Sequence, residues 1–239
     1  MSESRLKQIS DYLWEIPRSG AMRVPGRIYA SKMLMKQIEG DPCVEQVKNV
    51  AHLPGIASFS LAMPDIHWGY GFPIGGVAAM DAEEGVISPG GVGYDINCGV
   101  RLLTTGLAVE DVRDRIRPLL AQLFRDIPAG VGSHGAIPNL SHKQLDRLLA
   151  QGARQAVEMG YGSRQDVQFI EEQGRLDGAD PAKVSNHAKD RGSRQIGTLG
   201  SGNHFLEVDY VEEIYHPEAT DVLGLEKNQV VVIIHTGSR

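Results

Sequence analysis

The residues best suited to chemistry lie between positions 90 and 101, in the sequence Gly-Gly-Val-Gly-Tyr-Asp-Ile-Asn-Cys-Gly-Val-Arg. A carboxylate, Asp95, and a thiol, Cys98, stand three positions apart among four glycines. Glycines let a backbone approach a ligand closely or adopt positive φ. A carboxylate and a thiolate can bind one ion, and the thiolate favours a transition metal over magnesium or calcium. We therefore expect a metal site here, although an aspartate that caps a turn beside an inert, buried cysteine is the alternative.

Two histidines stand where ligands could be held firmly. His204 follows the glycine-rich segment 197–203, and His235 follows the β-branched run 230–234, which predicts a buried strand. With the carboxylate and the thiol they complete a set that suits manganese, iron, cobalt or zinc. The chain lacks the closely spaced Cys and His pairs of structural zinc sites, so a catalytic metal with open positions is favoured. A tight turn at His204 and a backbone-bonded His235 are the alternatives, and spacing alone does not show that the four groups converge.

A basic patch adjoins the segment 197–203, which could bind phosphate through its backbone N–H groups. Asn203 would add an amide that both donates and accepts. Arg191 and Arg194, together with Lys183 and Lys189, form the densest cluster of positive charge in an acidic chain. This combination favours an anionic substrate, and a solvated helix face explains the same charges equally well.

Asp65 and His67 form a further candidate pair, in the sequence Met-Pro-Asp-Ile-His-Trp. Their spacing places both side chains on one face of a strand. They could be metal ligands or a buried ion pair. The interpretation we favour is that they hold a ligand or the substrate in position.

Composition restricts the class of protein. The chain has 239 residues, a net charge of −6 and 41% hydrophobic residues, which is ordinary for a globular protein. Its acidity argues mildly against binding nucleic acid through bulk positive charge. Two cysteines cannot form a disulfide scaffold, and neither a signal peptide nor an apolar run of about 20 residues is found. We expect a cytoplasmic protein without a membrane segment.

The elements that must position these residues are predicted to be mixed. The glycine- and proline-rich region 54–101 favours short strands joined by tight turns, and residues 205–211 alternate like a strand. Residues 27–39 and 110–127 have helical spacing, and Pro118 should kink or restart the second helix. Ser141 and Gln144 form a capping-box pattern. The fold class expected is α+β, with several short-stranded sheets and peripheral helices.

Four blocks of the sequence resemble those of the RtcB-type RNA ligases. They are MPDIHWGYGFPIGGV at 63–77, GVISPGGVGYDINCGVR at 85–101, GTLGSGNHFLE at 197–207 and HTGSR at 235–239. The similarity runs in register from about residue 20 to the last residue. It implies an RtcB-like fold and an RNA ligase of tRNA splicing and RNA repair. Such enzymes join a 3′-phosphate or 2′,3′-cyclic phosphate end to a 5′-hydroxyl end, using GTP and manganese through a guanylylated histidine.

The resemblance also implies roles for individual residues. Asp95, Cys98 and His235 resemble the ligands of one manganese, and Cys98 resembles the thiolate that bridges to a second manganese, which His204 would help to hold. RNA, as tRNA halves or broken RNA, and GTP are the implied partners, with an archease-like helper as a further one. The segment that matches the nucleotide contacts comprises Asn203, His204, Phe205, Leu206 and Glu207.

Family proteins are about twice as long as this chain. We expect residues 1–239 to be the N-terminal portion of a single RtcB-like catalytic domain whose C-terminal half is absent. The guanylylated histidine is expected in that half, so no catalytic nucleophile is assigned here, and a separate C-terminal chain is a candidate partner. Two alternatives stay open: a metal-dependent phosphodiesterase or hydrolase that needs no nucleotide, and a non-catalytic fragment that binds RNA or metal or complements another chain.

Overall fold

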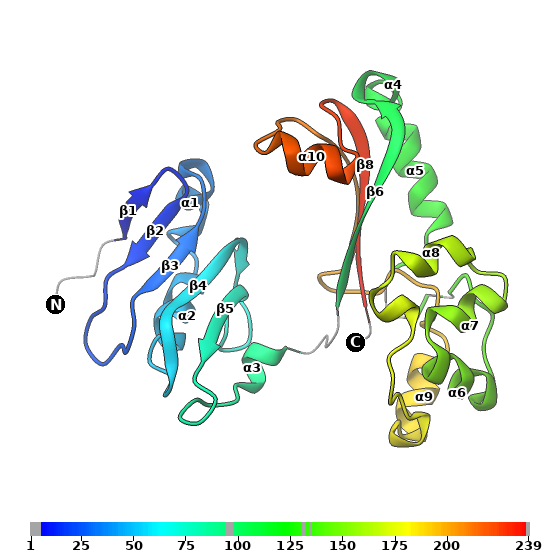
Figure 1. Cartoon of the computed structure of the whole chain (residues 1–239), viewed down its shortest axis with the longest axis horizontal. Helices are drawn as coiled ribbons and strands as arrows, with labels where there is room; N and C mark the ends of the chain where they lie inside the picture. Colours follow the sequence, from blue (N-terminus) through cyan, green and yellow to red (C-terminus); the bar gives the residue numbers. More distant parts are fainter. Residues whose placement is uncertain (1–5, 94–97, 131, 134, 238–239) are drawn as a thin grey trace. The chain divides into compact units, whose positions relative to one another are not determined.

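Strands and helices mix along the chain in two units, residues 1–96 and 97–239, as expected for an α+β protein (Figure 1). The computed structural model describes residues 6–93, 98–130, 132–133 and 135–237. Asp95 therefore lies outside the described residues. Each unit has its own sheet.

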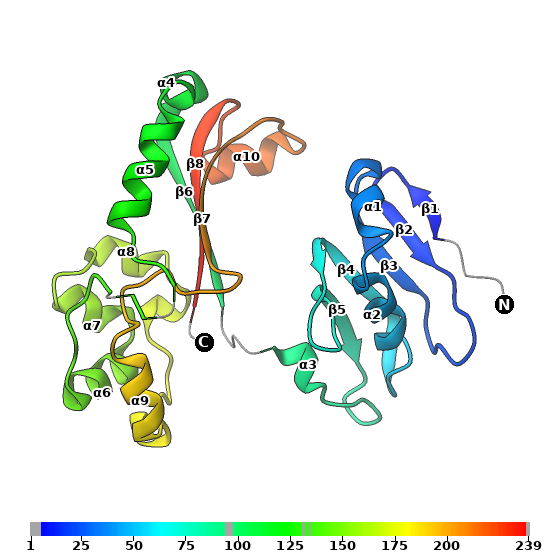
Figure 2. The same ribbon diagram turned by 180° about the vertical axis from the view of Figure 1, so that it is seen from behind.

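The first unit is built on a five-stranded sheet with the strand order β1-β2-β3-β4-β5. Neighbouring strands are antiparallel, except that β3 and β4 are parallel. Figure 2 shows α1 and α2 on the same face of this sheet. The elements are β1 (Lys7–Ser10), β2 (Leu13–Ile16), β3 (Gly26–Tyr29), α1 (Lys32–Ile38), α2 (Cys43–Val50), β4 (Ile56–His67), β5 (Ile74–Met80) and α3 (Pro89–Val92).

The core of this unit lies between its helices and the sheet. Helix α2 buries Cys43, Val47 and Val50, which share one helical face, and Ile28 of β3 is fully buried in the same cluster. The helix predicted over 27–39 is therefore wrong at its start. Residues 26–29 pair with strands on both sides, and α1 begins only after Ser31, whose hydroxyl accepts the N–H of Leu34.

The second unit contains an antiparallel sheet with the order β6-β8-β7. Its strands are β6 (Gly99–Ala108), β7 (Phe205–Tyr210) and β8 (Gln229–Thr236), which confirms both strands predicted in this region. The central strand comes last in the sequence. Strand β6 lies at an edge and exposes large apolar side chains, with Val100 62%, Leu102 51% and Leu103 47% accessible.

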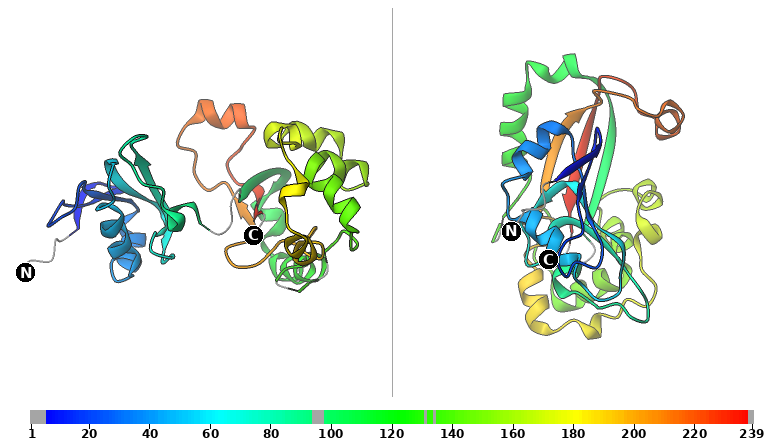
Figure 3. Two further views of the ribbon diagram at one scale, coloured as in Figure 1. Left: turned by 90° about the horizontal axis from the view of Figure 1, so that it is seen from below. Right: turned by 90° about the vertical axis from the view of Figure 1, so that its left-hand side faces the viewer.

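Helices surround this second sheet. Figures 1 and 3 show α5 and α10 on opposite sides of it, while α6, α7 and α9 gather near one of its ends. None of the helices within the described ranges is long and apolar enough to cross a membrane. The elements are α4 (Val109–Arg113), α5 (Ile116–Asp126), α6 (His142–Gln151), α7 (Ala153–Glu158), α8 (Arg164–Gln168), the 3-10 turns η1 (Glu171–Gly174) and η2 (Pro181–Lys183), α9 (Asn186–Gly192) and α10 (Pro217–Leu223).

Two local predictions for these helices are confirmed. The helical pattern at 110–127 divides into α4 and α5, and Pro118 stands in the first turn of α5, where a proline ring is tolerated. The Ser141 hydroxyl accepts the N–H of Gln144, and the Gln144 side chain accepts the N–H of Ser141, which completes the capping box of α6.

Candidate metal and nucleotide site

Cys98, His204 and His235 converge at one end of the three-stranded sheet. Cys98 directly precedes β6, His204 directly precedes β7, and His235 lies near the end of β8. The Cys98 Sγ is 2.7 Å from the His235 Nε2 and 3.6 Å from the His204 Nε2. Cys98 is exposed, so it is not the inert, buried cysteine of the alternative interpretation. The fold thus brings a thiol together with two imidazoles, each of which lies more than a hundred residues from it in the sequence.

Strand register explains why His235 faces the thiol. His235 pairs with Val100 on one side and with Phe205 on the other, so the three side chains share a face of the sheet. The Phe205 ring meets the His235 imidazole edge-on, with 4.9 Å between ring centroids. This contact restricts the orientation of the imidazole. Because side chains alternate along β7, Glu207 lies on the same face as Phe205, and Leu206 lies on the opposite one.

The glycine-rich segment 197–203 positions His204 through close contact. Gly200 has φ +98°, and a Cβ at this position would stand 2.1 Å from the His204 Nδ1. Its carbonyl accepts the N–H of Gly130 at 2.8 Å, and the Leu199 carbonyl accepts the Thr236 hydroxyl at 2.7 Å. These bonds fix the loop to a neighbouring loop and to β8. The Leu199 N–H donates to the Pro128 carbonyl, so this group is already bonded within the protein and is not available to bind a phosphate.

The donor set fits a transition metal, although the spacing fits only in part. Sulfur and nitrogen ligands around one tetrahedral ion stand about 3.5 Å apart, given metal–ligand distances near 2.3 and 2.0 Å. The Cys98–His204 separation of 3.6 Å matches this value, whereas the Cys98–His235 separation of 2.7 Å is shorter than two ligands of one ion allow. Across the described ranges, no three Cys, His, Asp or Glu side chains are arranged to hold a metal ion. Asp95, the predicted carboxylate ligand, lies outside those ranges.

The other predicted residues are placed as follows. Asp65 and His67 belong to β4 in the first unit, and the His67 Nδ1 lies 2.7 Å from the Asp65 carbonyl oxygen, so their contact runs through the backbone. Arg191 and Arg194 are exposed at the end of α9 and just after it. Lys189 differs from them, because it is only 7% exposed and pairs with a carboxylate, Asp146, at 2.7 Å. The basic patch therefore does not include Lys189.

Sequence reasoning missed a cavity of about 400 Å³ at the same end of the sheet. Arg101, Thr236 and Glu171 line it. Arg101 and Thr236 lie in blocks of the sequence already identified as candidates. Their closeness in sequence to Cys98 and His235 could have indicated that they also contribute to a site. Glu171 had no such signal, because its position depends on the close approach of Gly152 to Gly174, which are far apart in the sequence.

Comparison with known proteins identifies the family to which the chain belongs. Residues 46–239 match the family model described as tRNA-splicing ligase RtcB. The chain is 56% identical over 235 residues to a "tRNA-splicing ligase RtcB" of Thermococcus kodakarensis, covering 98% of the chain and 48% of that protein. It is 54% identical over 239 residues to a protein of the same name from Archaeoglobus fulgidus, covering 99% and 49%.

A bacterial relative shows the same pattern. An "RNA-splicing ligase RtcB" of Mycobacterium tuberculosis is 54% identical over 196 residues, covering 81% of the chain and 45% of that protein. The chain belongs to the RtcB family. It spans about half the length of the curated relatives it matches.

Proposed function

We propose that this chain provides the metal- and nucleotide-binding part of a GTP- and manganese-dependent RNA ligase. Such an enzyme joins a 3′-phosphate or 2′,3′-cyclic phosphate end of tRNA halves or broken RNA to a 5′-hydroxyl end, through a guanylylated histidine. Family membership and the names of the relatives support the class of reaction. The observation that carries the proposal is the convergence of the Cys98 thiol with the His204 and His235 imidazoles.

In this proposal, Asp95, Cys98 and His235 would hold one manganese, and Cys98 with His204 would help to hold a second. Bound metal supplies positive charge that stabilises the oxygens of a phosphoryl group during displacement. The protein contributes placement: the strand register holds His235, and the close approach of Gly200 holds His204. For both side chains to bind one ion, the Cys98 Sγ and the His235 Nε2 would have to move apart from their 2.7 Å contact.

The nucleotide would lie along the start of β7. Asn203 offers an amide, and Phe205 and Glu207 lie on the face of the sheet that also carries His235. A carboxylate can accept hydrogen bonds from the paired N–H groups of a guanine, and an aromatic ring can pack against a base. Leu206 lies on the opposite face, so we assign its contribution to the backbone. We assign no residue of this chain as the nucleophilic histidine, and we assign none to contact with an archease-like helper or a C-terminal partner chain.

Manganese binding tests the proposal directly. We expect the 239-residue chain to bind Mn²⁺, and we expect Cys98→Ala and His235→Ala to abolish binding while folding is retained. His52→Ala, an exposed histidine of the first unit, is the matched control and should bind manganese normally. Unchanged manganese stoichiometry in Cys98→Ala would refute the assignment.

The nature of the reaction needs a second assay. Supplied with a polypeptide that corresponds to the other half of a relative, the chain should seal RNA ends only when GTP is present. Manganese-dependent opening of 2′,3′-cyclic phosphates without GTP would instead favour a phosphodiesterase. A covalent label from α-labelled GTP on the chain alone would contradict the expectation that the nucleophile lies elsewhere.

A further inference from the structure

The cavity of about 400 Å³ lies on the opposite face of the sheet from His235. Arg101 pairs with Ile234, and Gly99 pairs with Thr236, so Arg101 and Thr236 point away from the face that carries Phe205 and His235. The volume falls within the roughly 300–1,000 Å³ of small-molecule sites. The cavity therefore stands beside the metal and nucleotide residues without sharing their side chains.

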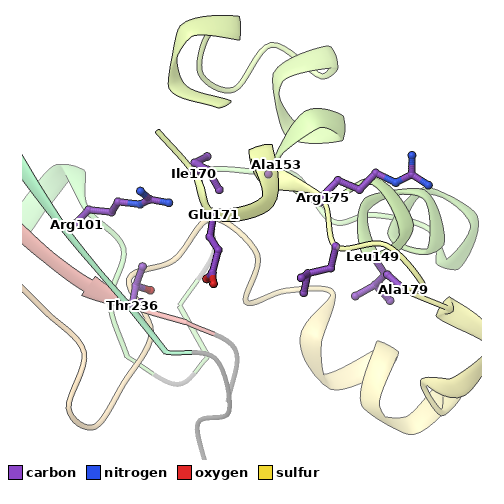
Figure 4. A pocket seen from close by; sticks show the side chains of 12 residues that line it. Arg101, Leu149, Ala153, Ile170, Glu171, Arg175, Ala179 and Thr236 are labelled. Atoms are coloured by element: carbon purple, nitrogen blue, oxygen red, sulfur yellow. The ribbon is translucent and has the colours of Figure 1, made fainter. Parts of the chain in front are cut away.

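The strand side of the cavity is polar. The Arg101 guanidinium donates to the Phe169 carbonyl, which anchors it, and its remaining fork of N–H groups has the geometry that suits phosphate. Figure 4 shows the Glu171 carboxylate reaching between Thr236 and Leu149, while the Arg175 guanidinium points away from Glu171. The lining therefore contains two arginines, Arg101 and Arg175, and one carboxylate, Glu171.

The helix side of the cavity is apolar. Its wall is formed by aliphatic side chains from the α6–α7 region and from the segment that follows η1: Leu149, Ala153, Leu176 and Ala179. Such a wall suits the flat, weakly polar face of a nucleic-acid base. The polar and apolar sides lie on either side of Glu171, which stands between Thr236 and Leu149 (Figure 4).

The backbone that carries Glu171 is held in an unusual conformation. Glu172 and Gln173, which follow it, both have φ +51°. The Arg154 side chain donates to the Gln173 carbonyl at 2.9 Å. A Cβ on Gly152 would stand 2.3 Å from the Gly174 carbonyl oxygen, so only glycine permits this close approach. Strained backbone of this kind, costing about 1–3 kcal/mol per residue, is concentrated at ligand sites.

We propose that this cavity binds one ribonucleotide of the RNA strand, close to the end that reacts. Arg101 binds its phosphate, Glu171 accepts a hydrogen bond from its 2′-hydroxyl, and its base packs against the aliphatic wall. The 2′-hydroxyl is the group by which a protein distinguishes RNA from DNA. Phe169, whose carbonyl anchors Arg101 and which directly precedes the lining residue Ile170, exposes 71% of its surface, and we assign to its ring a stacking contact with the neighbouring base. This inference rests on the proposed function, because it takes RNA as the substrate.

Fluorescence anisotropy with a short, 5′-labelled oligoribonucleotide that ends in a 3′-phosphate tests the phosphate contact. We expect Arg101→Gln to weaken binding by the whole chain roughly tenfold or more, as for the loss of a charge-assisted contact. Arg117→Gln makes the same change of charge at an exposed position of α5 that does not line the cavity, and it should alter binding by less than about twofold. Equal losses in the two variants, or no binding by the unmodified chain, would overturn the proposal.

A change in the ligand gives an independent readout, because Arg101→Gln also removes the bond to Phe169. A single 2′-deoxy substitution at one of the last positions of the oligonucleotide should weaken binding to the unmodified chain. The same substitution should have no effect on Glu171→Ala, because alanine removes the acceptor, whereas glutamine would keep one. If it weakens binding to both proteins equally, Glu171 does not contact the 2′-hydroxyl and the proposal fails.

The stacking contact has its own control. Phe169→Ala should weaken binding by about fivefold or more, whereas Phe124→Ala removes a ring that is 89% exposed on α5 and should change nothing. Failure here is distinguishable from failure of the proposed function. The latter would appear as unchanged manganese binding in Cys98→Ala, a measurement that involves no residue of the cavity.

Discussion

Replacing Gly200 by alanine should remove His204 from the metal site. The added Cβ would lie 2.1 Å from the His204 Nδ1, and ordinary contact requires about 3.4 Å, so the imidazole must move by roughly 1.3 Å. Metal–ligand distances tolerate only about 0.2 Å. His204 should therefore cease to act as a ligand, with an expected loss of metal affinity of at least 10–100-fold at the site it helps to form.

Backbone strain must be separated from this steric effect. Alanine at φ +98° is strained whatever surrounds it, at a cost of about 1–3 kcal/mol. Gly160→Ala is the matched control, because Gly160 has φ +91° and a Cβ there would meet nothing within 4 Å. Both variants should lower the thermal unfolding midpoint by similar amounts, and only Gly200→Ala should lose affinity.

The assay is titration of the two variants and the unmodified chain with Mn²⁺, followed by calorimetry, and with Co²⁺, followed by absorbance. Cobalt reports thiolate and imidazole ligation directly and suits the same donor set. Equal affinities for Gly200→Ala and Gly160→Ala would refute the reasoning. That result would mean either that His204 is not a ligand or that the loop yields without moving it.

Three further predictions concern the nucleotide segment, the two cysteines and the cap of α6. Asn203→Ala should weaken the binding or use of GTP more than it weakens manganese binding, because we assign the Asn203 amide to the nucleotide. Equal losses of GTP use and of manganese binding would contradict that role. Iodoacetamide near pH 8 should modify Cys98, which is exposed, and spare Cys43. Burial raises the pKa of the Cys43 thiol to about 12 and so keeps it protonated and unreactive. Peptide mass spectrometry that finds alkylated Cys43 in the folded chain would contradict this prediction. Ser141→Ala should lower the free energy of unfolding by about 1 kcal/mol, because it removes the N-cap of α6. Chemical denaturation that detects no change in this free energy would show that the cap is dispensable.

Local sequence signals predicted the elements they control. The β-branched run 230–234 became the centre of β8, and the capping pattern at Ser141 marked the start of α6. The strand at 26–29 was missed because four residues cannot establish a period of two, and the helical spacing beyond them is real. The parallel pairing of β3 with β4 and the placing of β8 between β6 and β7 are tertiary choices that no short window encodes.

The candidate site, like the fold, could be predicted from the sequence only in part. Residue type and glycine context identified Cys98, His204 and His235 as candidates, and the strand register supplied their convergence. Lys189 was assigned to a basic surface because the sequence does not show that Asp146 neutralises it inside the fold. Glu171 could not be predicted at all, since its place in the cavity depends on two glycines that meet from distant segments.

The strand order of the second sheet also determines when the site can form during synthesis. Cys98 and His235 are 137 residues apart, and β6 has no partner in this sheet until β8 emerges. At about 5–20 residues per second, a ribosome needs roughly 7–27 s to cover that interval. Throughout it, the backbone N–H and C=O groups of β6 that pair with β8 in the folded chain have no strand to pair with, and unpaired strand edges promote aggregation. Nascent chains of this protein should therefore depend on chaperones during that interval, and slower translation between β6 and β8 should increase their aggregation.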